Sequence, residues 1–381
     1  TPNDSNFVAD GLMASDLQPH PAMHEFMWVN RPVRVTLADD RKHLIVTNAQ
    51  SFRDLGWLEA RWTLRQPDDV AATGRLKVPS VSPGESARVP LPAAVTKSSN
   101  LLASLSVSWR TRRDEPWASA GHLVAWDQVA VGGALVLRDN IENNLNTFLL
   151  FDEPLPTLWR APVDNDGFKM MTQHHGGGRA LARWLEQGLQ LGLPGLVEHD
   201  EEWVLQPDGS ISIAHNFVLP ESLADPARVG VVFPVASIFT HVRWSGLGPY
   251  ENYPDRCSAA IDGVWAGEPD ELPYLVPQDF GLRMNCRWFE LVSPEEGIAL
   301  RFTAERGTTF NASATWHTDE DLYTARDHTE LRRRDFLTVH LDAQTRGLGS
   351  ASCGPDVLPQ YQIGPGTYRL SFTASSRIIS E

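Results

Sequence analysis

Apolar and polar residues alternate one by one along many short stretches of this chain, which is the pattern of half-buried β-strands. The clearest stretch runs from residue 103 to residue 109, where every second position is a serine and the others are Ala103, Leu105, Val107 and Trp109. Similar stretches, separated by turn-forming residues, are 33–37, 44–47, 58–64 and 122–131. About six or seven strands in about 100 residues are typical of an immunoglobulin-like sandwich.

From about residue 132 the chain is again mostly β in pattern. A region of about 250 residues is too long for a small sandwich and favours a large domain of two sheets. A hairpin is predicted over Glu202–Pro220, with its turn at Pro207–Ser210. Further strands are predicted at residues 229–233, 239–244, 297–303, 336–341 and 368–372. One helix is predicted over Arg179–Leu191, with an apolar face made of Leu181, Trp184, Leu185 and Leu189.

Charge and composition exclude several classes of protein. The 381 residues carry 33 Lys and Arg against 48 Asp and Glu, a formal net charge of −15. Neutralising phosphates requires a basic face, so we expect no nucleic-acid partner. No stretch approaches the ~20 apolar residues of a membrane span, and the first residues lack the basic and apolar segments of a signal peptide. Cys257, Cys286 and Cys353 lie far apart, which favours reduced thiols in a soluble, cytoplasmic protein.

Two groups of carboxylates are candidates for chemistry. One is Asp164-Asn165-Asp166, and the other is Glu251 with Asp255. Paired carboxylates support glycoside hydrolysis, but short Asp and Asn side chains also brace turns by binding nearby amides. Taken alone, bracing is the commoner of these two roles. The adjacent His174 and His175 can ligate a metal, yet no third ligand follows at a fixed spacing, which favours an ordinary surface pair.

Four stretches of the chain, in one order, resemble the LacZ-type β-galactosidases of glycoside hydrolase family 2. Residues 1–21 resemble the last segment of their catalytic barrel. Residues 159–166 read Trp-Arg-Ala-Pro-Val-Asp-Asn-Asp, and residues 246–256 read Gly-Leu-Gly-Pro-Tyr-Glu-Asn-Tyr-Pro-Asp-Arg. Both resemble signatures of the family's C-terminal domain, and residues 347–355 resemble a further loop of it. The matches extend over nearly the whole chain.

The resemblance implies a mainly β fold in three parts. Residues 1–25 would be the end of a catalytic TIM barrel, residues 26–131 an immunoglobulin-like β-sandwich, and residues 132–381 a large antiparallel β-sandwich of the galactose-mutarotase-like kind. The implied activity is retaining hydrolysis of terminal β-D-galactosyl bonds, as in lactose. Both catalytic glutamates are expected upstream of Thr1, so this chain contains no catalytic residue and is expected to be inactive alone.

The resemblance also implies site residues, ions and partners. The backbone carbonyl of Phe7 and the side chain of Asp10 would help to bind a sodium ion beside the galactose, and Asp10 would also contact the sugar. Cys353 would lie at the mouth of the substrate pocket, where a related enzyme has a stacking Trp. Magnesium is expected in the full enzyme with ligands outside this chain. The expected partners are the galactoside, the N-terminal and barrel domains of the same enzyme, and further copies in a homo-oligomer.

One loop is implied to move at the rim of the active site. It is entered by Asp164, Asn165, Asp166 and Gly167. Neither carboxylate group matches the family's catalytic glutamates, so the resemblance favours loop bracing for Glu251 and Asp255. Between about residues 140 and 159 the chain is shorter than the family pattern.

Two alternative functions remain at this stage. The chain would be a separately encoded small subunit of a heteromeric β-galactosidase if a start codon preceded it directly. It would be a non-catalytic carbohydrate-binding module if exposed residues among its 13 tryptophans bound sugar without a catalytic partner.

Overall fold

The computed structural model describes residues 11–66, 69–77, 80–96, 103–131, 147, 150–171, 178–223 and 225–379. Over these residues the protein is mainly β, and its sheets are antiparallel, which confirms the predicted fold class at this level. No helix in the described part of the chain is both long and apolar enough to cross a membrane. The chain divides into a smaller unit, Ala22–Arg138 with Ser258–Val264, and a larger unit formed by the rest.

The smaller unit contains two sheets around one core. Its strands are β1 (Val33–Leu37), β2 (His43–Asn48), β3 (Leu58–Gln66), β4 (Asp69–Leu76), β5 (Ser86–Pro90), β6 (Ser104–Thr111) and β7 (Leu123–Ala130). Three of them form a sheet in the order β1-β2-β5, and four form a sheet in the order β4-β3-β6-β7. Its helices are α1 (Ala22–Val29), the short 3₁₀ helix η1 (Leu55–Trp57) and α2 (Ala93–Thr96).

Apolar residues at every second position of β6 contribute to the core of this unit. Leu105, Val107 and Trp109 are each at most 1% exposed, and they share one cluster with Val33 of β1 and Leu44 of β2. Side chains of both sheets therefore pack face to face, as the period-2 pattern predicts.

A distant segment of the chain, Ser258–Val264, completes the smaller unit. The indole Nε1 of Trp126 donates to the carbonyl of Ala259 at 2.9 Å. The amide of Gln128 donates to the carbonyl of Asp262 and accepts from its N–H, both at 2.8 Å. The segment is thus tied to β7 by specific hydrogen bonds of both polarities.

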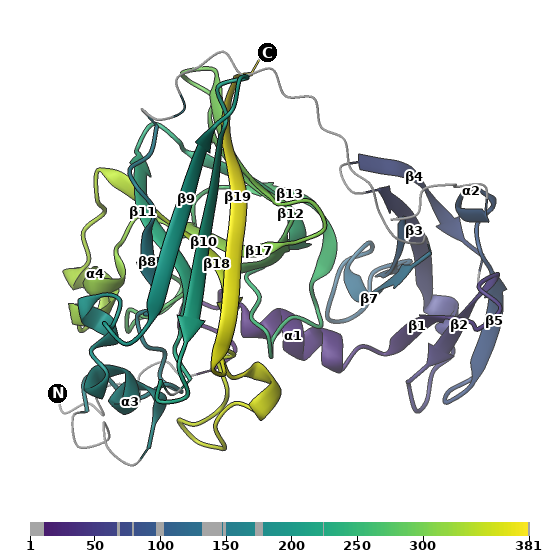
Figure 1. Ribbon diagram of the computed structural model, residues 1–381. Helices are drawn as coiled ribbons and strands as arrows, with labels where there is room; N and C mark the ends of the chain where they lie inside the picture. Colours follow the sequence, from purple (N-terminus) through teal and green to yellow (C-terminus); the bar gives the residue numbers. More distant parts are fainter. Residues whose placement is uncertain are drawn as a thin grey trace. The chain divides into compact units, whose positions relative to one another are not determined.

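The larger unit consists of a seven-stranded and a five-stranded sheet (Figure 1). The seven-stranded sheet has the order β13-β12-β15-β16-β19-β10-β9 and the five-stranded sheet the order β14-β17-β18-β11-β8. The strands are β8 (Leu155–Thr157), β9 (Glu198–Leu205), β10 (Ile211–Leu219), β11 (Arg228–Ala236), β12 (His241–Gly248), β13 (Ile261–Gly267), β14 (Arg283–Cys286), β15 (Trp288–Ser293), β16 (Ile298–Ala304), β17 (Phe310–Thr315), β18 (Phe336–Thr345) and β19 (Gly366–Ile378). The division between the two units falls within β13.

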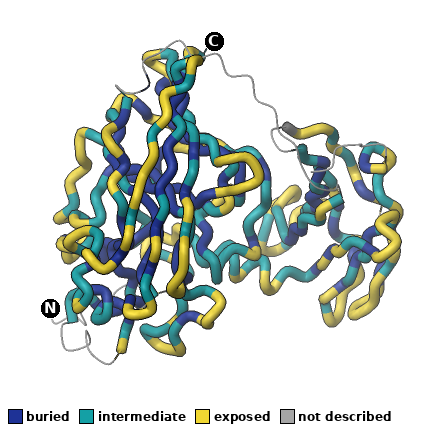
Figure 2. Tube along the Cα trace, viewed as in Figure 1, coloured by how far each residue is buried: buried dark blue, intermediate teal, exposed yellow. Residues whose placement is uncertain are grey.

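Aromatic side chains from both sheets meet in the core of the larger unit. The ring centroids of Phe233 (β11) and Phe302 (β16) are 5.3 Å apart, and those of Phe302 and Phe372 (β19) are 5.9 Å apart. Both pairs have edge-to-face geometry. All three are buried, and Figure 2 shows the buried strand segments running through the middle of this unit. The two sheets therefore enclose one continuous core.

The predicted hairpin is confirmed, and the predicted helix is confirmed in shortened form. β9 and β10 pair antiparallel from Glu198 opposite Val218 to Leu205 opposite Ile211. Helix α3 (Ala180–Glu186) buries Leu181 and Trp184 as expected. It ends early because Gly188 adopts a left-handed backbone with φ of 70°, after which the 3₁₀ helix η4 (Leu189–Leu191) follows. The remaining short helices are α4 (Asp319–Thr324), η5 (His328–Glu330) and η6 (Pro359–Tyr361).

A bulge in the pairing of β11 with β18 requires a glycine. The register shifts between Val229 and Gly230. A Cβ atom on Gly230 would lie 2.5 Å from the carbonyl oxygen of Leu341, so only a residue without a side chain fits there.

Candidate functional site

The three motif stretches, residues 159–166, 246–256 and 347–355, lie together. With the flanking residues Gly167, Arg346 and Asp356 they form one loop cluster, which consists of residues 159–167, 246–256 and 346–356. Asn165 joins the first to the third. Its amide donates to the carbonyl of Gly349 at 2.7 Å, and its Oδ1 accepts from the N–H and the hydroxyl of Ser352 at 3.0 and 2.6 Å. Ser352 is the residue before Cys353, so the structure brings two sequence-predicted site segments together.

Asp166 is the buried anchor of the first loop. The guanidinium of Arg160 donates to both of its carboxylate oxygens, at 2.9–3.1 Å, and Arg346 donates to Oδ1 at 3.3 Å. All three side chains are completely buried. The N–H of Val163 also donates to the carboxylate at 3.0 Å. This residue therefore fixes the loop from inside, as the turn-bracing interpretation predicts.

Arg346 links the loop cluster to two further carboxylates. It donates to Asp225 and to Asp356, both at 2.7 Å. Burial alone would lower the pKa of Arg346, but Asp166 and Asp225 raise it above its ordinary value. The guanidinium thus stays charged and holds three carboxylates around one buried point.

The second loop is braced by Asp255 and Glu251, as predicted. Asp255 accepts from the backbone N–H groups of Leu348 and Gly349 at 2.8 and 2.7 Å. Glu251 accepts from the N–H of Gly281 at 2.6 Å and from the Tyr274 hydroxyl at 3.1 Å, and it also pairs with Arg256. Both carboxylates are committed to neighbours inside the protein, so the loop-bracing interpretation is confirmed.

The other sequence-predicted site residues differ in their placement. Cys353 is exposed and its backbone N–H closes a turn onto the carbonyl of Ser350 at 3.1 Å. Asp164 is partly buried, and Gly167 is buried against Leu181 of α3. Phe7 and Asp10 lie outside the described residues, as do His174 and His175. The roles of Cys353 and of the rim loop stay predictions.

A second polar cluster lies inside the larger unit, where β11 and β18 pair. Arg228 donates to Asp279 at 2.7 Å and to Asp342 at 3.4 Å, and the Tyr253 hydroxyl donates to Asp279 at 2.7 Å. Burial raises the pKa of Asp342 to about 7. Arg228 lowers this pKa only in part, because the nearby carboxylates of Asp279 and Asp319 raise it. Burial likewise raises the pKa of Asp319 to about 6. Sequence reasoning missed this cluster.

Sequence reasoning also missed a third cluster, made of His199, Glu201 and His215 on the hairpin of β9 and β10. The predicted hairpin turn could have revealed this cluster. The predicted turn at Pro207–Ser210 fixes the register of the hairpin, and that register places His215 opposite Glu201 and diagonal to His199.

The loop cluster contributes one exposed thiol, and three of its five carboxylates, Asp166, Asp255 and Glu251, are bound to arginines or backbone amides. General acid or nucleophilic work needs a carboxylate that can reach a substrate. These three carboxylates therefore position loops and do not themselves supply acid–base chemistry.

Comparisons with known proteins agree with the resemblance that the motifs indicated. A family model described as the β-galactosidase small chain matches residues 132–374, and one described as β-galactosidase domain 4 matches residues 44–132. A β-galactosidase of Actinobacillus pleuropneumoniae is 26% identical over 98% of this chain and 41% of its own length. One of Photobacterium profundum is 25% identical over 99% of this chain and 43% of its own length.

A third relative, a β-galactosidase of Arthrobacter sp., is 26% identical over 95% of this chain and 42% of its own length. The chain thus spans about two fifths of the length of the curated relatives it matches. Because the match from residue 132 to residue 374 covers more than half of the 381 residues, the chain belongs to the β-galactosidase small-chain family.

Proposed function

We propose that this chain is the C-terminal part of a retaining β-galactosidase and completes its substrate pocket, while the two catalytic glutamates belong to another part of the protein. The names of the relatives and the fraction of their length that the chain spans support this division. So do the structural hydrogen bonds and ion pairs of three of the five loop-cluster carboxylates, Asp166, Asp255 and Glu251. Hydrolysis of terminal β-D-galactosyl bonds, as in lactose, would then require both parts.

The finer fold assignment belongs to the same proposal. Residues 26–131 would be an immunoglobulin-like sandwich, which two packed sheets of three and four strands support. Residues 132–381 would be the large sandwich of the galactose-mutarotase-like kind, and residues 1–25 the end of a catalytic TIM barrel. Homo-oligomerisation of a cytoplasmic enzyme is part of this proposal by analogy with the family.

The pocket elements in this chain would be Cys353, the loop entered at Asp164, and the sodium ligands Phe7 and Asp10. A carboxylate such as that of Asp10 suits a hard cation, and magnesium would be held by ligands outside this chain. A thiol offers no flat surface for stacking on sugar, so Cys353 would leave a weak subsite for the leaving group. The observation that carries the proposal is the bonding of Asn165 to Ser352, because it couples the loop at 164–167 to the loop of Cys353.

The test is the substitution Asn165→Ala in the full-length enzyme. It removes three side-chain hydrogen bonds between the loops. We expect the KM for lactose to rise by up to about tenfold, the equivalent of about 1.4 kcal/mol, because the pocket wall is no longer held in place. The matched control is Asn216→Ala, which removes a partly exposed asparagine that donates to Asp200 and accepts from Arg369, on the β9–β10 hairpin. A folded Asn165→Ala enzyme with unchanged KM would count against a pocket role.

A separately encoded small subunit is the second candidate, and the description of the family model that matches residues 132–374 favours it. In that case the catalytic glutamates would lie on a separate polypeptide. The mass of the native polypeptide distinguishes the two candidates, since an enzyme as long as the relatives is more than twice as heavy as the 42.3 kDa of these 381 residues.

A further inference from the structure

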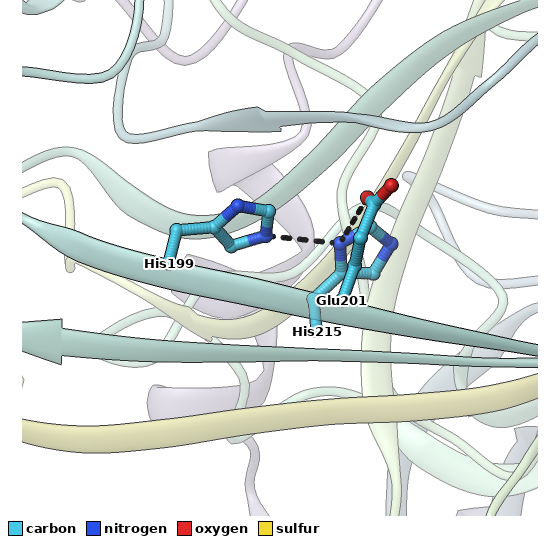
Figure 3. Close-up of side chains that lie close together, drawn as sticks. All are labelled: His199, Glu201 and His215. Carbon is cyan, nitrogen blue, oxygen red and sulfur yellow. Dashed lines mark hydrogen bonds and ion pairs between the residues drawn. The ribbon is translucent and has the colours of Figure 1, made fainter.

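Strand β9 forms one margin of the seven-stranded sheet, and its inner face carries two potential metal ligands. His199 and Glu201 are two residues apart and point to the same face, as strand geometry requires. His215 of β10 stands directly opposite Glu201 in the pairing register. Figure 3 shows the three side chains turned toward one another from the two neighbouring strands.

The three ligand atoms are close enough to share one ion. His199 Nε2 lies 3.1 Å from His215 Nδ1, and Glu201 Oε2 lies 3.5 Å from the same nitrogen. All three atoms lie within 4.8 Å of one another. Metal–ligand bonds of about 2.0–2.2 Å in a tetrahedral site place ligand atoms about 3.4 Å apart. The two shorter separations bracket that value, and the exposed Glu201 is able to close the remaining gap.

The ring N–H groups of the two histidines do not provide a hydrogen bond for every contact in this cluster. One shared proton satisfies the contact between the two imidazoles, and the Glu201 carboxylate then faces His215 Nδ1 without a good hydrogen bond. His215 is completely buried among aromatic rings, with Phe217 and Phe372 stacked beside it. The cluster thus presents two ring nitrogens and one carboxylate oxygen, all within 4.8 Å of one another, to a single ion.

Two imidazoles and one carboxylate suit zinc and similar late transition ions. Mg²⁺ and Ca²⁺ prefer oxygen ligands, so they fit this set poorly. The planes of the two rings differ by only 16°, with centroids 5.4 Å apart, and the two nitrogens point at each other across one shared proton. Binding therefore requires each ring to turn about its Cβ–Cγ bond, which the partly exposed His199 can do more freely than the buried His215.

We infer that His199, Glu201 and His215 form a binding site for Zn²⁺ or a similar divalent transition ion at the margin of the larger unit. The ion would clamp β9 to β10, its one neighbour among the strands that the structure describes. Three protein ligands leave a fourth position open to water or to an outside group, on the side where Glu201 reaches solvent. This inference does not rest on galactosidase activity.

The test is zinc titration of the metal-free 381-residue chain by isothermal calorimetry, with metal content of the dialysed protein as a second measurement. We expect one zinc ion per chain, no binding of Mg²⁺, and a rise of the melting temperature with zinc. Cobalt in place of zinc should give the visible absorption of a tetrahedral site with nitrogen and oxygen ligands.

The deciding variants are His199→Ala and Glu201→Gln, both at positions exposed enough to change without unfolding the protein. Each should weaken zinc binding by at least about tenfold, since even outer-shell changes cost 10–100-fold. The matched control Glu202→Gln changes the next residue of β9, on the opposite face, and should bind zinc normally. Absence of stoichiometric zinc binding in the unmodified chain would overturn the inference. Full affinity in either variant would also overturn it, because the ion would then be bound elsewhere.

Discussion

Arg160, Asp166 and Arg346 form a completely buried triad in which two guanidinium groups surround one carboxylate. Removing charges from water costs several kcal/mol per ion, and only close, well-directed hydrogen bonds recover it. Here Asp166 receives four such bonds from the two arginines and one from a backbone N–H. These five hydrogen bonds therefore hold the loop in its shape.

The substitution Asp166→Asn tests this role. It removes the negative charge that Arg160 and Arg346 share inside the protein. We therefore expect the free energy of unfolding to fall by about 3–5 kcal/mol. Urea unfolding followed by tryptophan fluorescence measures the loss. Asp152→Asn is the control, because Asp152 is exposed and its substitution should change stability by no more than about 0.5 kcal/mol. Equal stability of the two variants would show that the triad does not hold the loop.

At the scale of residues, local chemistry was predictable from the sequence and distant partners were not. Turn bracing by Asn165 and Asp166 follows from short polar side chains beside a proline and a glycine. Arg160 belongs to the same motif as Asp166, but Arg346 lies 180 positions further along the chain. No periodicity connects residues so far apart, so their contact depends on how the sheets are assembled.

At the scale of elements, the pairing of β11 with β18 encloses more carboxylates than cations. Arg228 of β11 faces Asp342 of β18 and is shared with Asp279. Asp319 lies near them and is 3.4 Å from Nε2 of His340, whose pKa burial and Arg228 hold well below its usual range. Because burial penalises the charged carboxylate, and Asp279 and Asp319 lie nearby, the proton on Asp342 is retained to unusually high pH.

This excess of buried acid predicts a pH dependence of stability. The pKa of Asp342 is 3.8 in the unfolded chain and about 7 in the folded one, so the folded state binds this proton more tightly. The resulting stabilisation is complete below pH 3.8 and is lost as the pH rises toward 7. The substitution Asp342→Asn imitates the protonated form and should remove this dependence.

Unfolding free energies of both proteins between about pH 5 and about pH 8 measure the effect. Relative to the unmodified chain, the variant should gain on the order of 2 kcal/mol across this range. Parallel pH profiles for the two proteins would contradict a retained proton on Asp342.

The elements themselves were largely predictable, because each depends on nearby residues. The stretches 229–233 and 336–341 lie within β11 and β18, and the β9–β10 hairpin has its predicted turn. The pairing of β11 with β18 and its bulge at Gly230 were not predictable, since strands about 100 residues apart carry no local signal of their register. The predicted helix was too long because its apolar pattern continues past the left-handed Gly188.

At the scale of the whole molecule, the chain contains two β units and spans about two fifths of its relatives. The motif order in the sequence predicted the family, and the family models confirm it. Motifs were informative here because the three loops that carry them bond to one another in the folded protein. The participation of Ser258–Val264 in the smaller unit was not predictable, because its bonds to Trp126 and Gln128 are made mainly by its backbone.

The central claim is that this chain completes a β-galactosidase without supplying its catalytic glutamates. Turnover of a nitrophenyl β-galactoside by the purified 381-residue chain tests it most directly, with the same chain joined to the rest of the protein as the positive control. We expect no turnover by the chain alone and hydrolysis when the rest of the protein is present. Hydrolysis by the chain alone would contradict the claim, because a complete pair of catalytic residues would then have to lie within it.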